Sequence, residues 1–441
     1  MVEPIRGHRP HPFVRASAPF AAAAALAALG ALAWPAIAAE PASVLEASRK
    51  QVPTGPWPAG DEKGMGNTIG AGTHLRCGWH LSQPKAKTYE LSHVRSNTMP
   101  KSPFTGPYTT QYKPTAVLPG TAHAFNSEKY AADAEPAQQG TQIDAIGHFA
   151  YLDRPWDGQG APPLDGARYY GGFTQQQVKP TPDSPLLKLG MDKAPPLVTT
   201  AVLLDAKAAV GKGQPLKGGD LVTAAHIQQM LKAQGLARRG ILPGDVVLIH
   251  TGWGDQWKDP GGDSTPYYTQ GPGLSYDAAQ YLGRARIVAV GLDVPFIDPV
   301  AEGFLQGKAA PAAGTPAGLP FAVHHHMLTQ MGVHHLESVR TAEAAADRVW
   351  TSCTMILPLR TAGAAGSAIR PIAIGVPGQR QLRSDRPARG RRRHVRASPR
   401  RPGARRAGCD SPTGRAAGPS TYSGLMPTSR AIAWYSFTSP S

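Results

Sequence analysis

The stretch from residue 138 to residue 148, QQGTQIDAIGH, carries side chains that could hold a cation. Side chains alternate between the two faces of a β-strand, so a strand here would place Gln138, Gln142 and Asp144 on one face. Gly140 would leave open space between them. Two carboxamides and one carboxylate offer the oxygen ligands that a divalent cation accepts. The pattern therefore predicts half of a metal-ligand shell.

His148 lies four residues after Asp144 and could face the same cavity after a turn. An imidazole near a bound water is suited to take its proton, because the imidazole pKa lies close to neutrality. We therefore predict that His148 is a general base. The spacing alone also allows a structural pair between the two side chains, and the residues by themselves leave both interpretations open.

This segment resembles the metal-binding motif of the cyclase family, which includes bacterial kynurenine formamidase and isatin hydrolase and has the usual pattern H-x-G-T-H-x-D-x-P-x-H. Four positions match that pattern: Gly140, Thr141, Asp144 and His148. Gln138 and Gln142 stand where the pattern has histidines, and Ile146 replaces the proline. A branch of the family that carries G-T-Q in place of G-T-H is the closer likeness.

The resemblance covers about residues 55–375, in the expected order. Further matching segments are DEKG at 61–64 with Asn67, GD at 244–245 leading into HTGW at 250–253, GLDVP at 291–295, and PLR at 358–360 through Gly366 to Ile374. The resemblance implies the swivelling β/β/α fold of the family, a mixed sheet with surrounding helices.

In the family, a His and a Glu twelve residues apart complete the metal site, and here Glu337 lies twelve residues after His325. On one continuous helix these positions would point about 120° apart. The chain must therefore break between them, and Gly332 is the natural place because glycine tolerates left-handed backbone. A short helix followed by a strand would return both side chains to the sheet. Four neighbouring histidines leave open which histidine faces the site: His324, His326, His334 and His335. The alternative interpretation is a histidine-rich surface turn.

The resemblance implies a metal-dependent hydrolase acting on a small molecule. The implied ligands of the divalent cation are Asp144, Gln142, His325 and Glu337, together with Gln138. Such a cation lowers the pKa of a bound water from 15.7 towards about 7, and His148 would remove the proton. The hydroxide would then open an amide, lactam, ester or lactone. The carboxamides favour a harder ion, so we expect manganese or zinc. The alternatives are a non-catalytic binding protein on the same fold and a lyase or cyclase that uses the same metal.

Short β-branched runs predict the strands that must position this site, at residues 197–204, 246–250 and 287–291. A helix is predicted between the first two, with Thr223 as N-cap and Gly235 as its stop. A second helix is expected over 275–282. Strands interleaved with few helices indicate an α/β or α+β domain with a sizeable sheet. Aromatic residues such as Phe104 could line a substrate pocket, although packing in the core explains most aromatic residues.

The domain organisation follows from changes in composition. Residues 1–38 combine early arginines, an apolar run and a small-residue cleavage site, a pattern that is typical of a signal peptide. We therefore expect a periplasmic or secreted protein that leaves the membrane after cleavage. Residues 39–60 resemble a linker or an N-terminal arm, and 61–375 the hydrolase domain. Residues 376–441 are rich in Arg and Pro and are predicted to be a disordered tail. We interpret this tail as a frameshift product. The alternative is a basic arm that binds an anionic surface.

The net charge of +16 is concentrated outside the predicted domain. Residues 376–441 hold 14 Arg against 2 Asp, with neither Lys nor Glu, so this segment alone carries +12. A nearly neutral body argues against nucleic acid and for a small-molecule substrate. The resemblance implies a homo-oligomer. Three cysteines form no disulfide framework, and buried isolated thiols are expected ahead of a pair between Cys77 and Cys353.

Overall fold

The computed structural model describes residues 40–106, 108–117, 119–130 and 139–379. The predicted signal peptide, the expected ligand Gln138 and residues 380–441 of the predicted tail lie outside the described residues. Within the described part of the chain, every helix is too short or too polar to cross a bilayer.

Nine strands form one mixed sheet in the order β1-β15-β13-β7-β9-β11-β12-β6-β14. Their bounds are β1 Lys87–Glu90, β6 Gln142–Asp144, β7 Leu197–Asp205, β9 Val246–His250, β11 Ala289–Leu292, β12 His334–Glu337, β13 Thr351–Ile356, β14 Gly366–Ala368 and β15 Ile372–Gly375. The four strands β7, β9, β11 and β12 run parallel to one another, and the flanking strands pair antiparallel. The predicted α/β class with a mixed sheet is confirmed.

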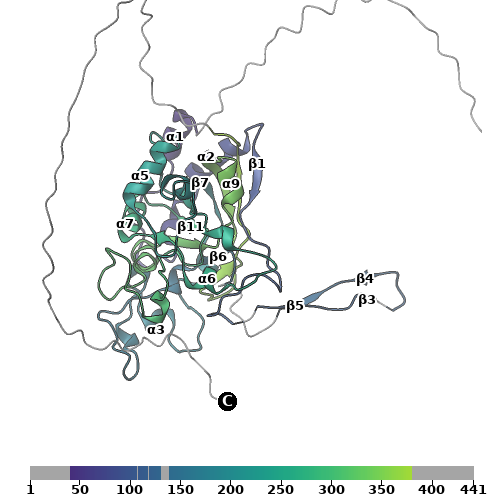
Figure 1. The fold of residues 1–441 in the computed structure, drawn as a ribbon, viewed down its shortest axis with the longest axis vertical. Helices are drawn as coiled ribbons and strands as arrows, with labels where there is room; N and C mark the ends of the chain where they lie inside the picture. The colour runs from purple at the N-terminus through teal and green to yellow at the C-terminus, as the bar shows by residue number, and fades with distance from the viewer. Residues whose placement is uncertain (1–39, 107, 118, 131–138, 380–441) are drawn as a thin grey trace, which may run out of the picture. The chain divides into compact units, whose positions relative to one another are not determined.

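Helices surround this sheet (Figure 1). The helices are α1 Ala42–Arg49, α2 Ala71–Leu81, α3 Gln175–Val178, α4 Ala206–Ala209, α5 Ala224–Ala233, α6 Thr265–Thr269, α7 Tyr276–Arg284, α8 Ala322–His324 and α9 Ala342–Ala346, with a π-helix over His325–Met331. Single 3-10 turns lie at Gly64–Thr68, Ile146–His148, Leu164–Gly166, Tyr170–Gly172, Met191–Lys193, Trp253–Gln256 and Phe304–Gln306. Helix α2 packs on β7, β13 and β15, and α5 packs on β7 and α7.

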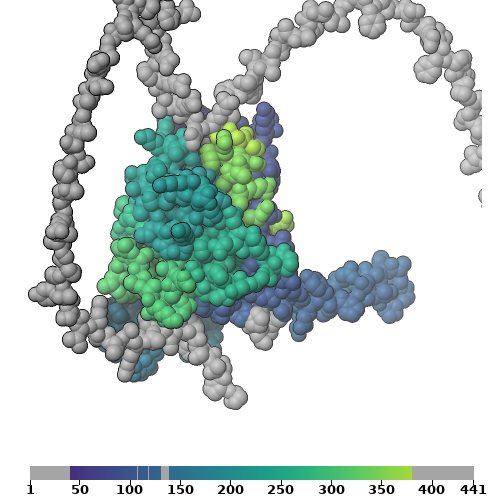
Figure 2. All heavy atoms as spheres, in the orientation of Figure 1, coloured from purple at the N-terminus to yellow at the C-terminus, as the bar shows by residue number. Residues whose placement is uncertain are grey.

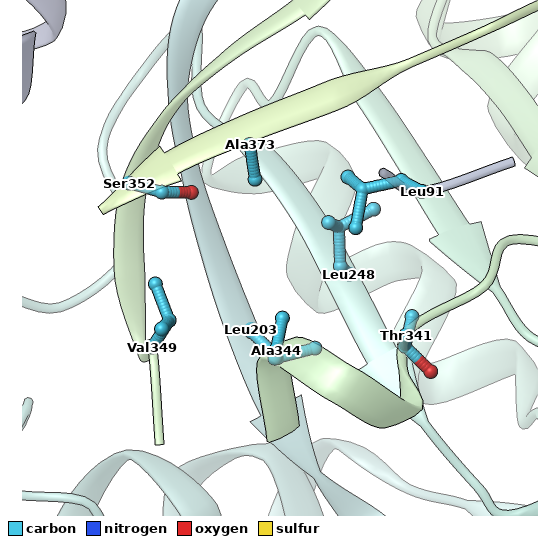
Figure 3. A pocket seen from close by; sticks show the side chains of 8 residues that line it. All are labelled: Leu91, Leu203, Leu248, Thr341, Ala344, Val349, Ser352 and Ala373. Atoms are coloured by element: carbon cyan, nitrogen blue, oxygen red, sulfur yellow. The ribbon is translucent and has the colours of Figure 1, made fainter. Parts of the chain in front are cut away.

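The central strands are buried along almost their whole length, as parallel strands covered on both faces must be. All residues of β9 and β11 are buried, and the three predicted strands coincide with β7, β9 and β11 to within two residues. Helix α5 begins as predicted, because the Thr223 hydroxyl accepts a hydrogen bond from the His226 amide. Against the sheet lies one small apolar cavity, lined by leucine and alanine side chains among others (Figure 3).

Residues 40–60 are an arm folded against the body, so the linker interpretation is wrong. Helix α1 packs on α2, because it buries Leu45 and Ser48. The preceding Glu40 is also buried. The expectation of isolated thiols is wrong as well, because Cys77 of α2 forms a disulfide with Cys353 of β13 across 276 residues of sequence. The disulfide therefore joins segments that lie far apart in the sequence.

A two-stranded antiparallel ribbon extends from the body of the domain (Figures 1 and 2). One arm of the ribbon contains β2 Thr110–Tyr112 and β3 Ala116–Val117, and the returning arm contains β4 Ala124–Phe125 and β5 Glu128–Tyr130. Strand β2 pairs with β5, and β3 pairs with β4. Tyr112 and Val117 are mostly exposed there. Two further short strands, β8 Leu221–Val222 and β10 Gly273–Leu274, pair in parallel.

Candidate metal centre

The candidate centre is built first by two neighbouring strands, β6 and β12. They pair antiparallel with Glu337 opposite Gln142 and Leu336 opposite Ile143. Since side chains alternate along a strand, Gln142 and Asp144 share one face with His335 and Glu337. All four side chains are buried. The predicted shared face of Gln142 and Asp144 is thus confirmed.

A third element adds His324, the last residue of α8. Its Nε2 lies 3.7 Å from Oδ2 of Asp144 and 3.5 Å from Oε1 of Glu337. Its ring centroid is 4.6 Å from that of His335. Ligand atoms of Asp144, His324 and His335 all lie within 4.8 Å of one another. We refer to Asp144, His324, His335 and Glu337 as the metal centre.

The structure does not bring His325, the predicted ligand, to this cluster, and the neighbouring His324 lies there instead. The His325 ring packs edge-on against Tyr151, and its Nδ1 lies 3.2 Å from the Thr329 hydroxyl. Adjacent residues of a helix point about 100° apart, so only one of the two histidines can face the sheet. The chain does break as expected at Gly332, whose φ of 63° ends the π-helix before β12.

Asp298 fixes the orientation of His324. Its Oδ2 lies 2.6 Å from Nδ1 of His324, and its carboxylate also accepts the backbone amides of Val323 and His324. A carboxylate on one ring nitrogen leaves the other nitrogen aimed at the centre, as in many metal sites. Asp298 therefore positions His324, and no spacing pattern in the sequence predicts this pair.

Several buried polar atoms of the centre lack a hydrogen-bond partner among the described residues. They are both carboxylate oxygens of Asp144 and both ring nitrogens of His335. A buried polar group without a partner costs roughly 1–3 kcal/mol, and more when it is charged. A divalent cation would satisfy these atoms together, and a mixed carboxylate and imidazole set suits manganese or zinc. The residues present therefore fit such an ion.

The electrostatics of the centre follow from burying several ionisable groups together. Burial, and then the neighbouring Asp144 charge, raises the pKa of Glu337 to about 7. Burial lowers the pKa of His335 well below its ordinary value, and the nearby His324 lowers it further. For His324 the burial effect is outweighed by the three carboxylates around its ring, those of Asp144, Asp298 and Glu337, which raise its pKa well above the ordinary value. The centre thus combines one imidazole whose charged form is disfavoured by burial, His335, with a second imidazole, His324, that three carboxylates surround.

Two other predicted residues lie at the margin of the centre. Gln142 donates from Nε2 to Oε2 of Glu337 at 2.9 Å, so its amide nitrogen holds a ligand carboxylate in place. His148 ends the 3-10 turn after β6 and is half-buried, with its ring centroid 6.5 Å from that of His324. Both positions are within reach of a molecule bound at the centre.

His250 and Asp293, at the ends of β9 and β11, bind each other. Nδ1 of His250 lies 3.2 Å from Oδ2 of Asp293, which also accepts the Gly252 amide. Burial alone would lower the pKa of His250, but the Asp293 carboxylate outweighs it and raises that pKa. This pair supports the loop that leaves β9.

The model of a family described as putative cyclase matches residues 32–299, well over half of the chain. A solved structure described as a novel cyclase is 22% identical, with a TM-score of 0.57, covering 72% of this chain and 97% of its own. That likeness confirms the expected fold. None of the curated proteins matches the sequence.

Two isatin hydrolases are more distant. One, bound to the product analogue thioisatinate, is 17% identical with a TM-score of 0.43, covering 68% of this chain and 96% of its own. Isatin hydrolase A from Ralstonia solanacearum is 18% identical with a TM-score of 0.42, covering 68% of this chain and 95% of its own.

Proposed function

The chain belongs to the putative cyclase family, and we propose that it is a metal-dependent hydrolase that opens a C–N or ester bond of a small amide, lactam or lactone. The observation that carries this proposal is the set of buried carboxylate oxygens and imidazole nitrogens without partners at the metal centre. Among the described residues these atoms make no hydrogen bond, although His324 lies within ion-pair distance of Asp144, so a bound cation would give them partners.

The ligands would come from both strands and from α8. Asp144, His324, His335 and Glu337 would hold the cation, and Gln142 would keep Glu337 oriented through its amide. A bound divalent cation would supply Lewis acidity, which acidifies water and polarises a carbonyl. Manganese or zinc is the expected ion.

His148 is the proposed general base. It lies beside the centre and outside the group of ligand atoms that gather within 4.8 Å. An imidazole there can accept a proton from the attacking water and return it to the leaving amine or alkoxide. Its ring stands next to Phe149, with centroids 5.4 Å apart, which helps to fix its orientation.

We further propose that the protein is exported to the periplasm or secreted. The apolar N-terminal segment with its small-residue cleavage site supports this, and so does the pairing of Cys77 with Cys353, since disulfides persist in oxidising compartments. A homo-oligomer remains our expectation, and the exposed apolar side chains of the β2–β5 ribbon are consistent with one.

The test is metal analysis of the purified protein, followed by a screen of amides, lactams, lactones and esters. We expect one or more equivalents of a divalent ion, activity lost on chelation and activity restored by manganese or zinc. A protein that carries no metal, takes up none and binds small carboxylates without turning over any compound would instead be a binding protein.

A further inference from the structure

Five of the ten phenylalanines in the chain form a connected set of ring contacts that starts beside the metal centre. They are Phe104, Phe149, Phe296, Phe304 and Phe321. Consecutive ring centroids are 6.5 Å apart from Phe149 to Phe321, 6.4 Å from Phe321 to Phe296, and 6.4 Å from Phe296 to Phe104. Phe304 flanks Phe321 at 5.7 Å. We call these five residues the phenylalanine row.

The row begins at the centre and ends at the surface. The Phe149 ring lies 4.7 Å from the His324 ring, and Phe321 lies 6.1 Å from it. At the other end, Phe104 is 45% exposed. The rings between them are half-buried, unlike the aliphatic side chains of the core, which are almost fully buried. The row is therefore a partly solvent-facing apolar surface that leads to the metal centre.

Packing of loops alone does not account for this arrangement. The rings come from four separate segments: the loop before the ribbon, the turn after β6, the loop after β11, and the approach to α8. Apolar rings that converge from separate segments and still face solvent are typical of a surface that a ligand covers. Because the Phe149 ring also lies against His324, a ligand on this surface would adjoin a molecule held at the metal centre.

We propose that the phenylalanine row binds an elongated apolar substituent of the substrate, so that the protein selects amides or lactones carrying a long alkyl or extended aryl group. This inference rests on the proposed hydrolase function. One aromatic ring could contact Phe149 and Phe321, but it could not also reach Phe104, which lies two further ring separations away. The specificity-determining residues are therefore Phe321 near the centre and Phe104 at the far end.

Binding is tested with linear alkanoates from butanoate to dodecanoate, titrated calorimetrically into the full-length purified protein. The carboxylate should bind at the centre and the chain along the row. We expect affinity to rise about fourfold per methylene, because each buried methylene contributes about 0.8 kcal/mol. Affinity that does not change with chain length would overturn the proposal.

The variants separate the two ends of the row. Phe104→Ala should weaken only the longest alkanoates, and Phe321→Leu should weaken all but the shortest. Phe125→Ala is the matched control, because Phe125 is similarly exposed on β4 and lies outside the row. Thermal unfolding of each variant checks the fold. Equal losses in Phe104→Ala and Phe125→Ala would also overturn the proposal.

A second series distinguishes this inference from the proposed function. γ-Lactones with alkyl substituents of increasing length are offered as substrates. Hydrolysis whose kcat/KM is independent of length would keep the hydrolase and remove the role of the row. Alkanoate affinity that rises with length, without hydrolysis of any lactone or amide, would keep the row and remove the hydrolase.

Discussion

Two buried polar clusters in this molecule differ in how their charges are satisfied. The arginine cluster, consisting of Glu40, Arg76, Arg239 and Asp245, is as deeply buried as the metal centre. Arg239 binds both oxygens of Glu40, at 2.9 and 2.8 Å from its Nε and Nη2, and also binds Asp245. Arg76 completes the chain, with its Nη2 3.3 Å from Oδ1 of Asp245.

Each charge in the arginine cluster meets an opposite charge within the chain. In the metal centre, by contrast, three carboxylates, those of Asp144, Asp298 and Glu337, lie within ion-pair distance of one imidazole, that of His324. Both Asp144 oxygens lack a hydrogen-bond partner among the described residues. Buried charges that are fully paired hold segments together, whereas an excess of buried charge of one sign marks a place for a ligand. We therefore infer that the arginine cluster serves folding and that the metal centre serves chemistry.

The largest effect is expected from removing a carboxylate of the metal centre. Asp144→Ala should lose both metal and turnover, because it removes a ligand. Its unfolding temperature without metal should equal or exceed that of the unmodified protein, because repulsion with Glu337 is relieved. Elemental analysis, an activity assay and thermal unfolding give the three readouts. An active Asp144→Ala protein would break the assignment of this cluster to chemistry.

His148→Ala should separate proton transfer from metal binding. Metal content should be unchanged, and kcat should fall by about 10²–10⁴-fold, the usual contribution of a general base. The measurement is kcat at saturating substrate together with metal content. If the variant loses its metal, His148 is a ligand and the proposed base is wrong.

The opposite pattern is expected in the arginine cluster. Arg239→Met removes the guanidinium that Glu40 and Asp245 share and leaves these buried carboxylates with only His80 and Arg76 beside them, so the free energy of unfolding should fall by about 3–5 kcal/mol. Urea unfolding measures the loss. The folded fraction should bind metal as the unmodified protein does, and altered metal affinity would show that the two clusters are not independent.

The smallest expected effect is on the pH dependence of folding stability, through the carboxyl group of Glu40. Burial by itself would raise the pKa of Glu40, but Arg239 outweighs it and holds that pKa well below its ordinary 4.5. A depressed carboxyl pKa stabilises the fold above the unfolded pKa and loses this contribution as pH falls through the folded value. The stability difference between the unmodified protein and Glu40→Gln should therefore be largest near neutrality and shrink below about pH 4.

Glu46→Gln supplies the control for that pH series. Glu46 pairs with Lys50 at 3.1 Å on the exposed side of α1, six residues after Glu40. Its replacement should change stability by less than about 0.5 kcal/mol at any pH, as is usual for exposed pairs. Equal effects of the two substitutions would remove the special role given to Glu40.

Local patterns in the sequence predicted those parts of the structure that depend on neighbouring residues. The strands β7, β9 and β11 follow from short β-branched runs, and the alternation of Gln142 with Asp144 follows from strand geometry. The break at Gly332 follows from the need to turn Glu337 back towards the sheet. Each depends on no more than a few adjacent positions.

Features set by distant contacts could not be predicted. Whether His324 or His325 faces the sheet depends on how the helix is rotated about its axis, and the contact with Asp298 sets that rotation. His335 could have been found from its spacing of two from Glu337, once a strand was assumed there. The burial of Glu40 and the disulfide depend on segments about 200 or more residues apart, for which no local pattern exists.

Whether Asp144, His324, His335 and Glu337 bind a cation is measured by calorimetric titration of manganese or zinc into chelator-treated protein. We expect saturable binding that raises the unfolding temperature, and loss of both effects in Asp144→Asn, which keeps the size of the side chain but removes its charge. Binding of equal strength in Asp144→Asn, or no binding by the unmodified protein, would contradict the assignment of Asp144, His324, His335 and Glu337 as a metal centre.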